Sequence, residues 1–142
     1  MQAGFTLIEL LVVIAIIGIL SAVVLASLST ARSRGNDAAV KQNMHGIQVQ
    51  AEIYSISNNG YGTQAYGTTC NAGMFSDTVI ARSRTSTDTL NGSGNVYCYA
   101  NSSGYLMAAD ITSGYWCIDS TGAAKGETGA APASIPAGSV CP

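Results

Sequence analysis

Four cysteines, Cys70, Cys98, Cys117 and Cys141, are the side chains of this 142-residue sequence most suited to chemistry. No two of them are close enough to form a CxxC pair, the spacing common in zinc sites, so metal ligation is not their expected use. Two disulfides in a small, glycine-rich globule are favoured instead. The residues alone leave three pairings open. Such disulfides indicate a compartment more oxidising than the cytoplasm.

Other side chains offer little catalytic chemistry. His45 is the single histidine, which excludes a zinc site built on two histidines, and we expect it on a helix surface. Asp110, Asp119 and Glu127 could suggest a calcium site, but there is no DxDxDG-like loop and carboxylates at strand ends are usually solvated, so no metal is predicted; no cofactor is expected either. A net charge of -2 with 10% charged residues provides no basic surface for nucleic acid. Beyond His45 there is no obvious histidine general base, and we expect that the protein is not an enzyme.

Glu9 is the only charged side chain before a long apolar run, residues 10–31. A helix over that run rises about 33 Å, enough to cross the hydrocarbon of a bilayer. A buried core helix is the alternative, but so small a protein cannot readily wrap a rod that is apolar all round. A secretory signal peptide is disfavoured, because nothing basic precedes Phe5 and the apolar run is too long.

The carboxylate of Glu9 needs a positive partner. In hydrocarbon an unpaired carboxylate costs on the order of a few kcal/mol. The nearest cationic side chain along the chain, Arg32, lies about 35 Å away if the segment is helical. The partner of Glu9 must therefore come from elsewhere than its own helix.

The residues GFTLIELLVVIAIIGIL, from Gly4 to Leu20, resemble the N-terminal signature of type IV prepilins and of the pseudopilins of type II secretion and DNA-uptake systems. The resemblance implies that a prepilin peptidase cuts after Gly4 and that the amine of Phe5 is then N-methylated. The ammonium created at Phe5 would pair with Glu9 of a neighbouring subunit. At about 4 Å and an effective dielectric near 20, that attraction is roughly 4 kcal/mol before desolvation.

The resemblance also implies a function and its partners. The expected protein is a subunit that polymerises through its N-terminal helix into a type IV pilus. Its partners would be further pilin subunits, the prepilin peptidase/N-methyltransferase, the inner-membrane assembly platform and the membrane itself. The precursor would span the inner membrane once, and the mature form would lie in a cell-surface filament. A pseudopilin of a secretion or competence system is the alternative, and a third is a membrane-anchored binding domain that never polymerises.

The expected fold class is α+β, with a long N-terminal helix packed on a small antiparallel sheet. Four segments are expected in order: a prepilin leader, a transmembrane and assembly helix, an amphipathic continuation of that helix, and a globular β domain with disulfides. Their residues are 1–4, 5–31, 32–57 and 58–142. A stop signal for the helix is the Asn-Asn-Gly triplet at 58–60. Gly18 is a point where the apolar helix can bend.

The second half of the helix carries two apolar stripes. One stripe, which we expect to cover a sheet, consists of Val40, Met44, Ile47, Ala51 and Tyr54. On the opposite side lie Val49, Ile53 and Ile56. This second stripe is left for another surface, and the resemblance implies that the surface is a neighbouring helix in the filament core. A more deeply buried helix is the alternative.

The cysteine-bearing half is predicted to contain an antiparallel meander of three strands, residues 95–100, 105–111 and 115–119. Residues 61–94 are expected to be irregular, with a short helical turn at 78–82. By alternation Trp116 and Ile118 share the face that meets the helix, with Leu106 and Ala108 as companions. The tyrosines of this half are expected to serve packing rather than ligand binding.

The resemblance to pilins favours one pairing of the cysteines. Cys117 with Cys141 would tie the C-terminal tail to the last predicted strand, as a C-terminal disulfide loop does in many pilins. Cys70 with Cys98 would then anchor the connecting loop to the first strand.

Overall fold

The computed structural model describes residues 4–131 and 140–142. The chain divides into two compact units, Met1–Arg34 and Gly35–Pro142. One helix, α1 (Leu7–Asn58), contributes residues to both.

In the first unit the apolar residues of α1 are exposed, from Leu7 through Leu28. Within the described chain, α1 is the one helix long and apolar enough to cross a membrane. The helix continues without interruption through Gly18, the residue at which we expected that it can bend. Among the described residues of this unit none covers the apolar surface, and an exposed apolar surface of this extent is typical of a segment that contacts lipid or another protein.

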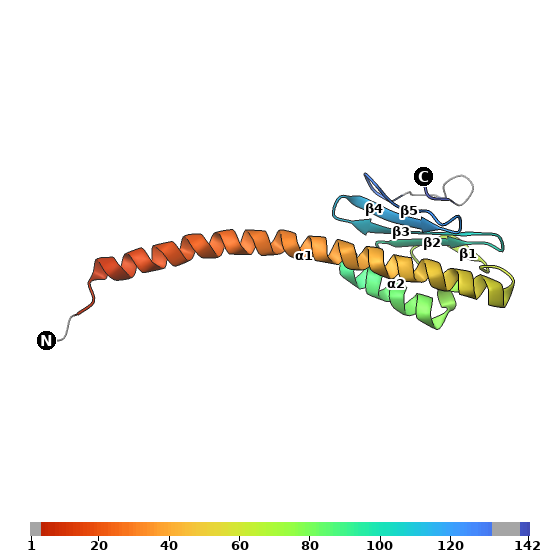
Figure 1. Ribbon diagram of the computed structural model, residues 1–142, viewed down its shortest axis with the longest axis horizontal. Coiled ribbons are helices and arrows are strands. Elements are labelled where there is room, and N and C mark those ends of the chain that lie inside the picture. The colour runs from red at the N-terminus through yellow and green to blue at the C-terminus, as the bar shows by residue number, and fades with distance from the viewer. Residues whose placement is uncertain (1–3, 132–139) are drawn as a thin grey trace. The chain divides into compact units, whose positions relative to one another are not determined.

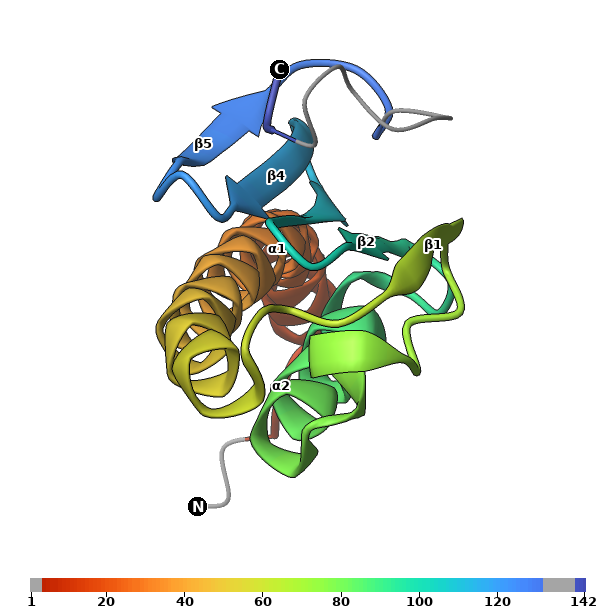
Figure 2. The same ribbon diagram turned by 90° about the vertical axis from the view of Figure 1, so that its right-hand side faces the viewer.

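The second unit is a two-layer structure of helices on one face of a five-stranded sheet (Figure 1). After α1 come β1 (Gln64–Gly67), the 3-10 helix η1 (Gly73–Ser76), α2 (Thr78–Asn91), β2 (Val96–Ala100), β3 (Tyr105–Ile111), β4 (Gly114–Asp119) and β5 (Ala124–Glu127). The strands pair antiparallel in chain order, which confirms the predicted meander and α+β class. Figure 2 shows α2 beside the second half of α1, with the sheet across both.

The main core lies between the helices and the sheet. The predicted helix stripe is buried there, with Val40, Met44, Ile47 and Ala51 almost inaccessible to solvent and Tyr54 packed at the edge. Trp116 and Ile118 lie in the same core, as predicted. Alternation along β4 puts these two side chains on one face because successive residues of a strand point to opposite sides.

The prediction for β3 was wrong by one residue. Leu106 and Ala108 lie on the outer face with Cys117, whereas Met107 and Ala109 point toward the helices. The pairing register sets this phase, since Met107 lies opposite Ile118 and Ala109 opposite Trp116. All residues from 105 to 109 are buried, so the strand is apolar on both sides and its pattern does not reveal which face meets the helices.

The expectation of an irregular segment at 61–94 was also wrong in part. The helical turn expected at 78–82 is the beginning of α2, which continues to Asn91, and β1 adds a strand before it. The sequence of α2 is rich in Thr and Ser, which are poor helix formers, so its stability depends on packing through Ile80 and Thr87. The unpredicted β5 carries mainly exposed residues and lacks an apolar alternation.

The end of α1 follows the predicted stop signal. Asn59 has a left-handed backbone with φ of 57°, and the amide of Gly60 donates to the carbonyl of Ser55 at 3.0 Å. This is the hydrogen bond of a Schellman cap, with asparagine in the position that glycine usually takes. Beyond the cap the chain turns back toward β1.

Candidate functional site

The first part of the candidate site is the junction between Gly4 and Phe5. Residues 4–6 precede the helix and have no regular structure, and the Phe5 side chain is 86% exposed. The peptide bond after Gly4 therefore lies outside α1 and on the surface. A protease could engage this bond without first unwinding the helix.

Thr6 and Glu9 form a reciprocal cap at the start of α1. The Glu9 carboxylate oxygen Oε2 accepts hydrogen bonds from the Thr6 amide at 2.8 Å and from Thr6 Oγ1 at 2.7 Å. In return the Glu9 amide donates to Thr6 Oγ1 at 3.3 Å. This is a capping box, in which two otherwise unpaired amides of the first turn gain partners. Sequence reasoning missed Thr6, although the Thr-x-x-Glu spacing is a recognisable signal of such a cap.

Glu9 has hydrogen-bond donors but no ion pair within the described residues, whose single salt bridge joins Lys125 and Glu127. The structure thus brings Gly4, Phe5 and Glu9 together at one end of α1. The capping box gives the Glu9 carboxylate hydrogen-bond donors. No cation in the described part of this chain neutralises the negative charge of that carboxylate.

A second exposed apolar surface lies on the second half of α1. Val49, Ile53 and Ile56 are 54%, 52% and 85% exposed, on the side away from the buried stripe. We call these three residues the outer stripe. The alternative of a more deeply buried helix is therefore excluded for this part of α1.

Polar contacts hold this half of α1 on the globule. Asp37 Oδ1 accepts hydrogen bonds from the amide and the hydroxyl of Thr112, each at 3.1 Å. Asn36 Nδ2 donates to the carbonyl of Leu90 at 3.2 Å. These contacts, with the buried stripe, orient the helix so that the outer stripe faces solvent.

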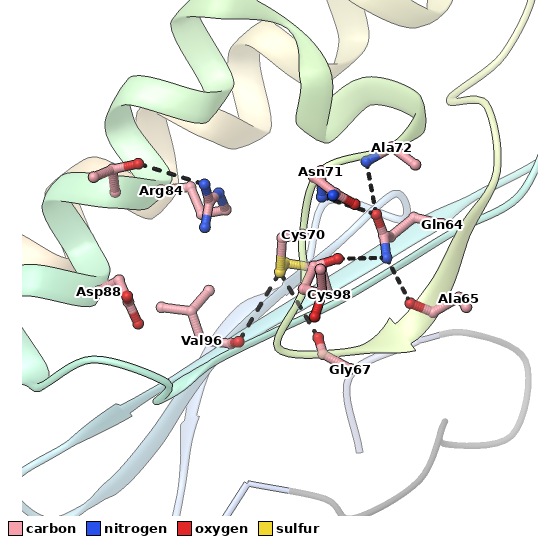
Figure 3. The surroundings of a disulfide bond; sticks show 12 residues. Gln64, Ala65, Gly67, Cys70, Asn71, Ala72, Arg84, Asp88, Val96 and Cys98 are labelled. Carbon is pink, nitrogen blue, oxygen red and sulfur yellow. Dashed lines mark hydrogen bonds between the residues drawn. A yellow bond between two sulfur atoms is a disulfide. The ribbon is translucent and has the colours of Figure 1, made fainter.

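The cysteines form two disulfides, Cys70–Cys98 and Cys117–Cys141, which are the pairings favoured above. The first joins the loop after β1 to β2. Figure 3 shows the buried side chain of Gln64 beside it. Gln64 Oε1 accepts from the amides of Asn71 at 3.0 Å and Ala72 at 2.8 Å, and its Nε2 donates to the carbonyl of Ala65 within β1 and to that of Thr69 in the loop. The side chain of Gln64 therefore supplies hydrogen-bond partners for backbone groups on both sides of Cys70.

The second disulfide lies on the outer face of the sheet, next to Asp119. Asp119 is 1% exposed, and its carboxylate accepts four hydrogen bonds, from Thr121, Ala123 and Cys141. Burial tends to raise the pKa of Asp119, but these donors stabilise the ionised form and lower the pKa below its usual value. From the sequence, Asp119 is at most a weak candidate for a cation site. In the structure both of its carboxylate oxygens accept hydrogen bonds from protein donors.

Tyrosines are used for packing in the globule. The hydroxyl of Tyr61 lies 2.9 Å from Glu52 Oε1, and its ring lies 5.0 Å from the buried ring of Tyr105. Burial, assisted by the carboxylate of Glu52, raises the pKa of Tyr61. Tyr66 and Tyr97 stack on the outer face. His45 is exposed on α1, as predicted.

The described residues thus combine an exposed apolar helix, which starts just after a Gly-Phe junction, with a helix-on-sheet globule, and this α+β architecture is pilin-like. Residues 1–25 match the family described as the prokaryotic N-terminal methylation motif. Together with the relatives reported next, this match confirms the resemblance of the N-terminal segment to type IV pilins and type II secretion pseudopilins.

Among curated relatives, the chain is 52% identical over 58 residues to the type IV wide pilus major component PilA4 of Thermus thermophilus. That match covers 41% of this chain and 44% of PilA4. The chain is 32% identical over 66 residues to the type II secretion system core protein G of Aeromonas hydrophila, covering 46% of each protein. The chain thus spans less than half the length of these relatives. No solved structure matches it at a significant level.

Proposed function

We propose that this protein is the structural subunit of a type IV pilus, cleaved after Gly4, N-methylated at Phe5 and polymerised through α1. The observation that carries the proposal is the exposed apolar surface of α1 directly behind the methylation motif. A stable protein must cover such a surface, with lipid before assembly and with neighbouring helices afterwards. The similarity to a pilus component over the N-terminal segment supports this function.

Processing is supported by the geometry of the junction. Cleavage after Gly4 leaves Thr6 and Glu9 in the chain, so the capping box is retained in the mature subunit. The new ammonium at Phe5 supplies the cation that Glu9 lacks. We infer that this ammonium meets Glu9 of an adjacent subunit, which sets the register of helices otherwise held by non-directional apolar contacts.

When the subunit passes from the membrane into a filament, the surroundings of the apolar part of α1 change from lipid to protein. In the inner membrane, lipid surrounds the apolar residues of α1; in the filament, helices of other subunits do. Lipid chains and leucine side chains are similarly apolar, so the exchange is nearly neutral in hydrophobic free energy. An assembly platform can therefore drive the step in either direction. The outer stripe would extend the helix contacts beyond the segment that spans the membrane.

The proposal is tested with Glu9→Ala. We expect the variant to insert into the membrane and to be cleaved after Gly4, but to yield at least tenfold fewer sheared surface filaments, because the charge that sets the register is gone. Glu127→Ala is the matched control, since it removes a partly exposed carboxylate of β5 that lies far from Glu9 in the sequence. Filaments at normal yield from the Glu9 variant would refute the pairing.

A pseudopilin of a type II secretion or competence system is the second candidate, favoured by the similarity to two type II secretion core proteins. Electron microscopy of sheared cells distinguishes the two, because a pilus subunit forms long surface fibres and a pseudopilin does not. Mass spectrometry of the cellular protein tests both against an anchored domain that never polymerises. Both filament proposals require an N-terminal N-methylated Phe5.

A further inference from the structure

Two interactions hold Cys141 on the outer face of the sheet, one through its side chain and one through its backbone. Its side chain forms the disulfide with Cys117, with the Cα atoms 5.8 Å apart. Its backbone amide donates to Asp119 Oδ2 at 2.7 Å. Cys117 and Asp119 are two residues apart in β4 and so point to the same face. One short stretch of strand therefore receives both the side chain and the backbone of Cys141.

The carboxylate of Asp119 is positioned without help from Cys141. Its Oδ1 accepts from the amide of Thr121 at 2.8 Å, from the hydroxyl of Thr121 at 2.6 Å and from the amide of Ala123 at 3.3 Å. Gln48 of α1 donates to the carbonyls of Asp119 and Ala123 at 3.4 and 3.1 Å. The turn after β4 and helix α1 thus hold the acceptor through contacts that do not involve the C-terminal residues.

The second oxygen of this carboxylate depends on Cys141. Within the described residues, Oδ2 accepts its hydrogen bond from the amide of Cys141 alone. A buried carboxylate oxygen without a donor is costly, and hydrogen bonds to an ionised acceptor are about twice as strong as neutral ones. A reduced chain is therefore stabilised when the amide of Cys141 reaches Oδ2, a position that places its thiol beside that of Cys117.

We propose that Asp119 is a positioning residue for oxidative folding, holding Cys141 beside Cys117 in the reduced chain and so selecting this disulfide among the possible pairings. The reaction is ordinary thiol–disulfide exchange with an oxidant of the glutathione disulfide class. One cysteine thiolate attacks the oxidant and releases one glutathione thiolate. The other cysteine then attacks the mixed disulfide and releases the second. Two electrons pass to the oxidant, and the two protons lost by the cysteines are taken up by glutathione.

The test follows both disulfides of the full-length chain in detergent micelles. The reduced, unfolded protein is diluted into a mixture of oxidised and reduced glutathione, and each disulfide is quantified by alkylation and peptide mass spectrometry. In Asp119→Asn we expect the effective concentration of the Cys117–Cys141 pair to fall about tenfold, equivalent to about 1.4 kcal/mol. Cys70–Cys98 serves as the internal reference for general destabilisation of the globule, and its effective concentration should fall by less than that of Cys117–Cys141. Glu127→Gln, which removes the charge of a partly exposed carboxylate in β5, should behave as the unmodified sequence does.

An unchanged effective concentration for Cys117–Cys141 in Asp119→Asn, or an equal fall for both disulfides, overturns the proposal. A second measurement retains Asp119 and therefore does not depend on the folding of that variant. In a chain carrying Cys117→Ser and Cys141→Ser, the backbone amide at position 141 should stay protected from hydrogen exchange, although no disulfide holds it. Exchange at the rate of an unstructured peptide would mean that Asp119 does not position the tail.

Discussion

Asp119 illustrates how a single residue combines several structural roles. It ends β4, its carboxylate holds the following turn, and it receives the amide of Cys141. Nothing in the sequence around it distinguishes it from a solvated carboxylate at the end of a strand. Its role depends on a residue 22 positions away in the chain, and only folding brings the two together.

The lowered pKa of Asp119 predicts an acid-dependent loss of stability. Because the folded state holds the proton less tightly than the unfolded state, this stabilisation is complete above the unfolded pKa of about 3.9 and is lost as pH falls through the lower folded value. We expect Asp119→Asn to lower the free energy of unfolding near pH 7 by about 2 kcal/mol, since its amide would direct a donor at the Cys141 amide. Denaturant titrations between about pH 7 and pH 2 measure both effects. A slope in the acid range as steep in the variant as in the unmodified protein would contradict this assignment.

Thr6 is the second residue whose role depends on one partner. Thr6→Val keeps the shape of the side chain but removes the hydroxyl that the Glu9 amide uses, which should cost about 1 kcal/mol of local helix stability. We expect hydrogen exchange at the Glu9 amide, measured in micelles, to accelerate about fivefold. Thr6→Ser retains the hydroxyl and should preserve the slow exchange. Equal rates in all three chains would show that the cap contributes nothing.

At the scale of an element, α1 presents different surfaces along its length. Up to residue 34 it is exposed and largely apolar; beyond that it buries one stripe against the sheet and α2, and exposes another. The 3.6-residue period places Ile47 and Ile53 on different sides of the same helix. The two isoleucines therefore have different surroundings: Ile47 is buried in the core, and Ile53 is exposed to solvent.

This difference predicts that the same substitution, isoleucine to alanine, affects stability at one position and filament assembly at the other. Ile47→Ala creates a cavity in the core and should lower the free energy of unfolding by about 3 kcal/mol. Ile53→Ala alters an exposed position and should change stability by less than about 0.5 kcal/mol, while reducing filament yield through the lost apolar contact. Denaturant unfolding of each variant and electron microscopy of sheared filaments measure the two outcomes. If Ile53→Ala left the filament yield unchanged, the outer stripe would have no part in assembly.

For the whole molecule, the important feature is the separation of two kinds of apolar surface. The helix-facing core and both disulfides belong to the unit Gly35–Pro142, whereas the longest exposed apolar surface belongs to Met1–Arg34. Substitutions in the apolar head should therefore leave the core of the globule intact. The proposed filament function would require this, because the globule would have to stay folded while the head exchanged lipid for neighbouring helices.

The separation predicts that residues 35–142, expressed alone under oxidising conditions, fold without the apolar head. We expect a cooperative unfolding transition and a monomer on size exclusion at concentrations where the full-length chain needs detergent, because the core contacts lie inside this unit. Circular dichroism and light scattering check the two properties. An aggregated or unfolded product with both disulfides formed would show that the globule requires the head.

The sequence by itself determined the apolar helix, its stop after Asn58, the three central strands and the motif at Gly4 to Glu9. These features are local, since hydrophobic period, turn residues and a short motif act over a few neighbouring residues. The tertiary structure alone decided the phase of β3, the length of α2 and the role of Asp119. β3 is apolar on both faces, α2 has weak intrinsic helix propensity, and the donors to Asp119 include one from the far end of the globule. Each was decided by contacts between segments distant in the chain, which no local pattern encodes.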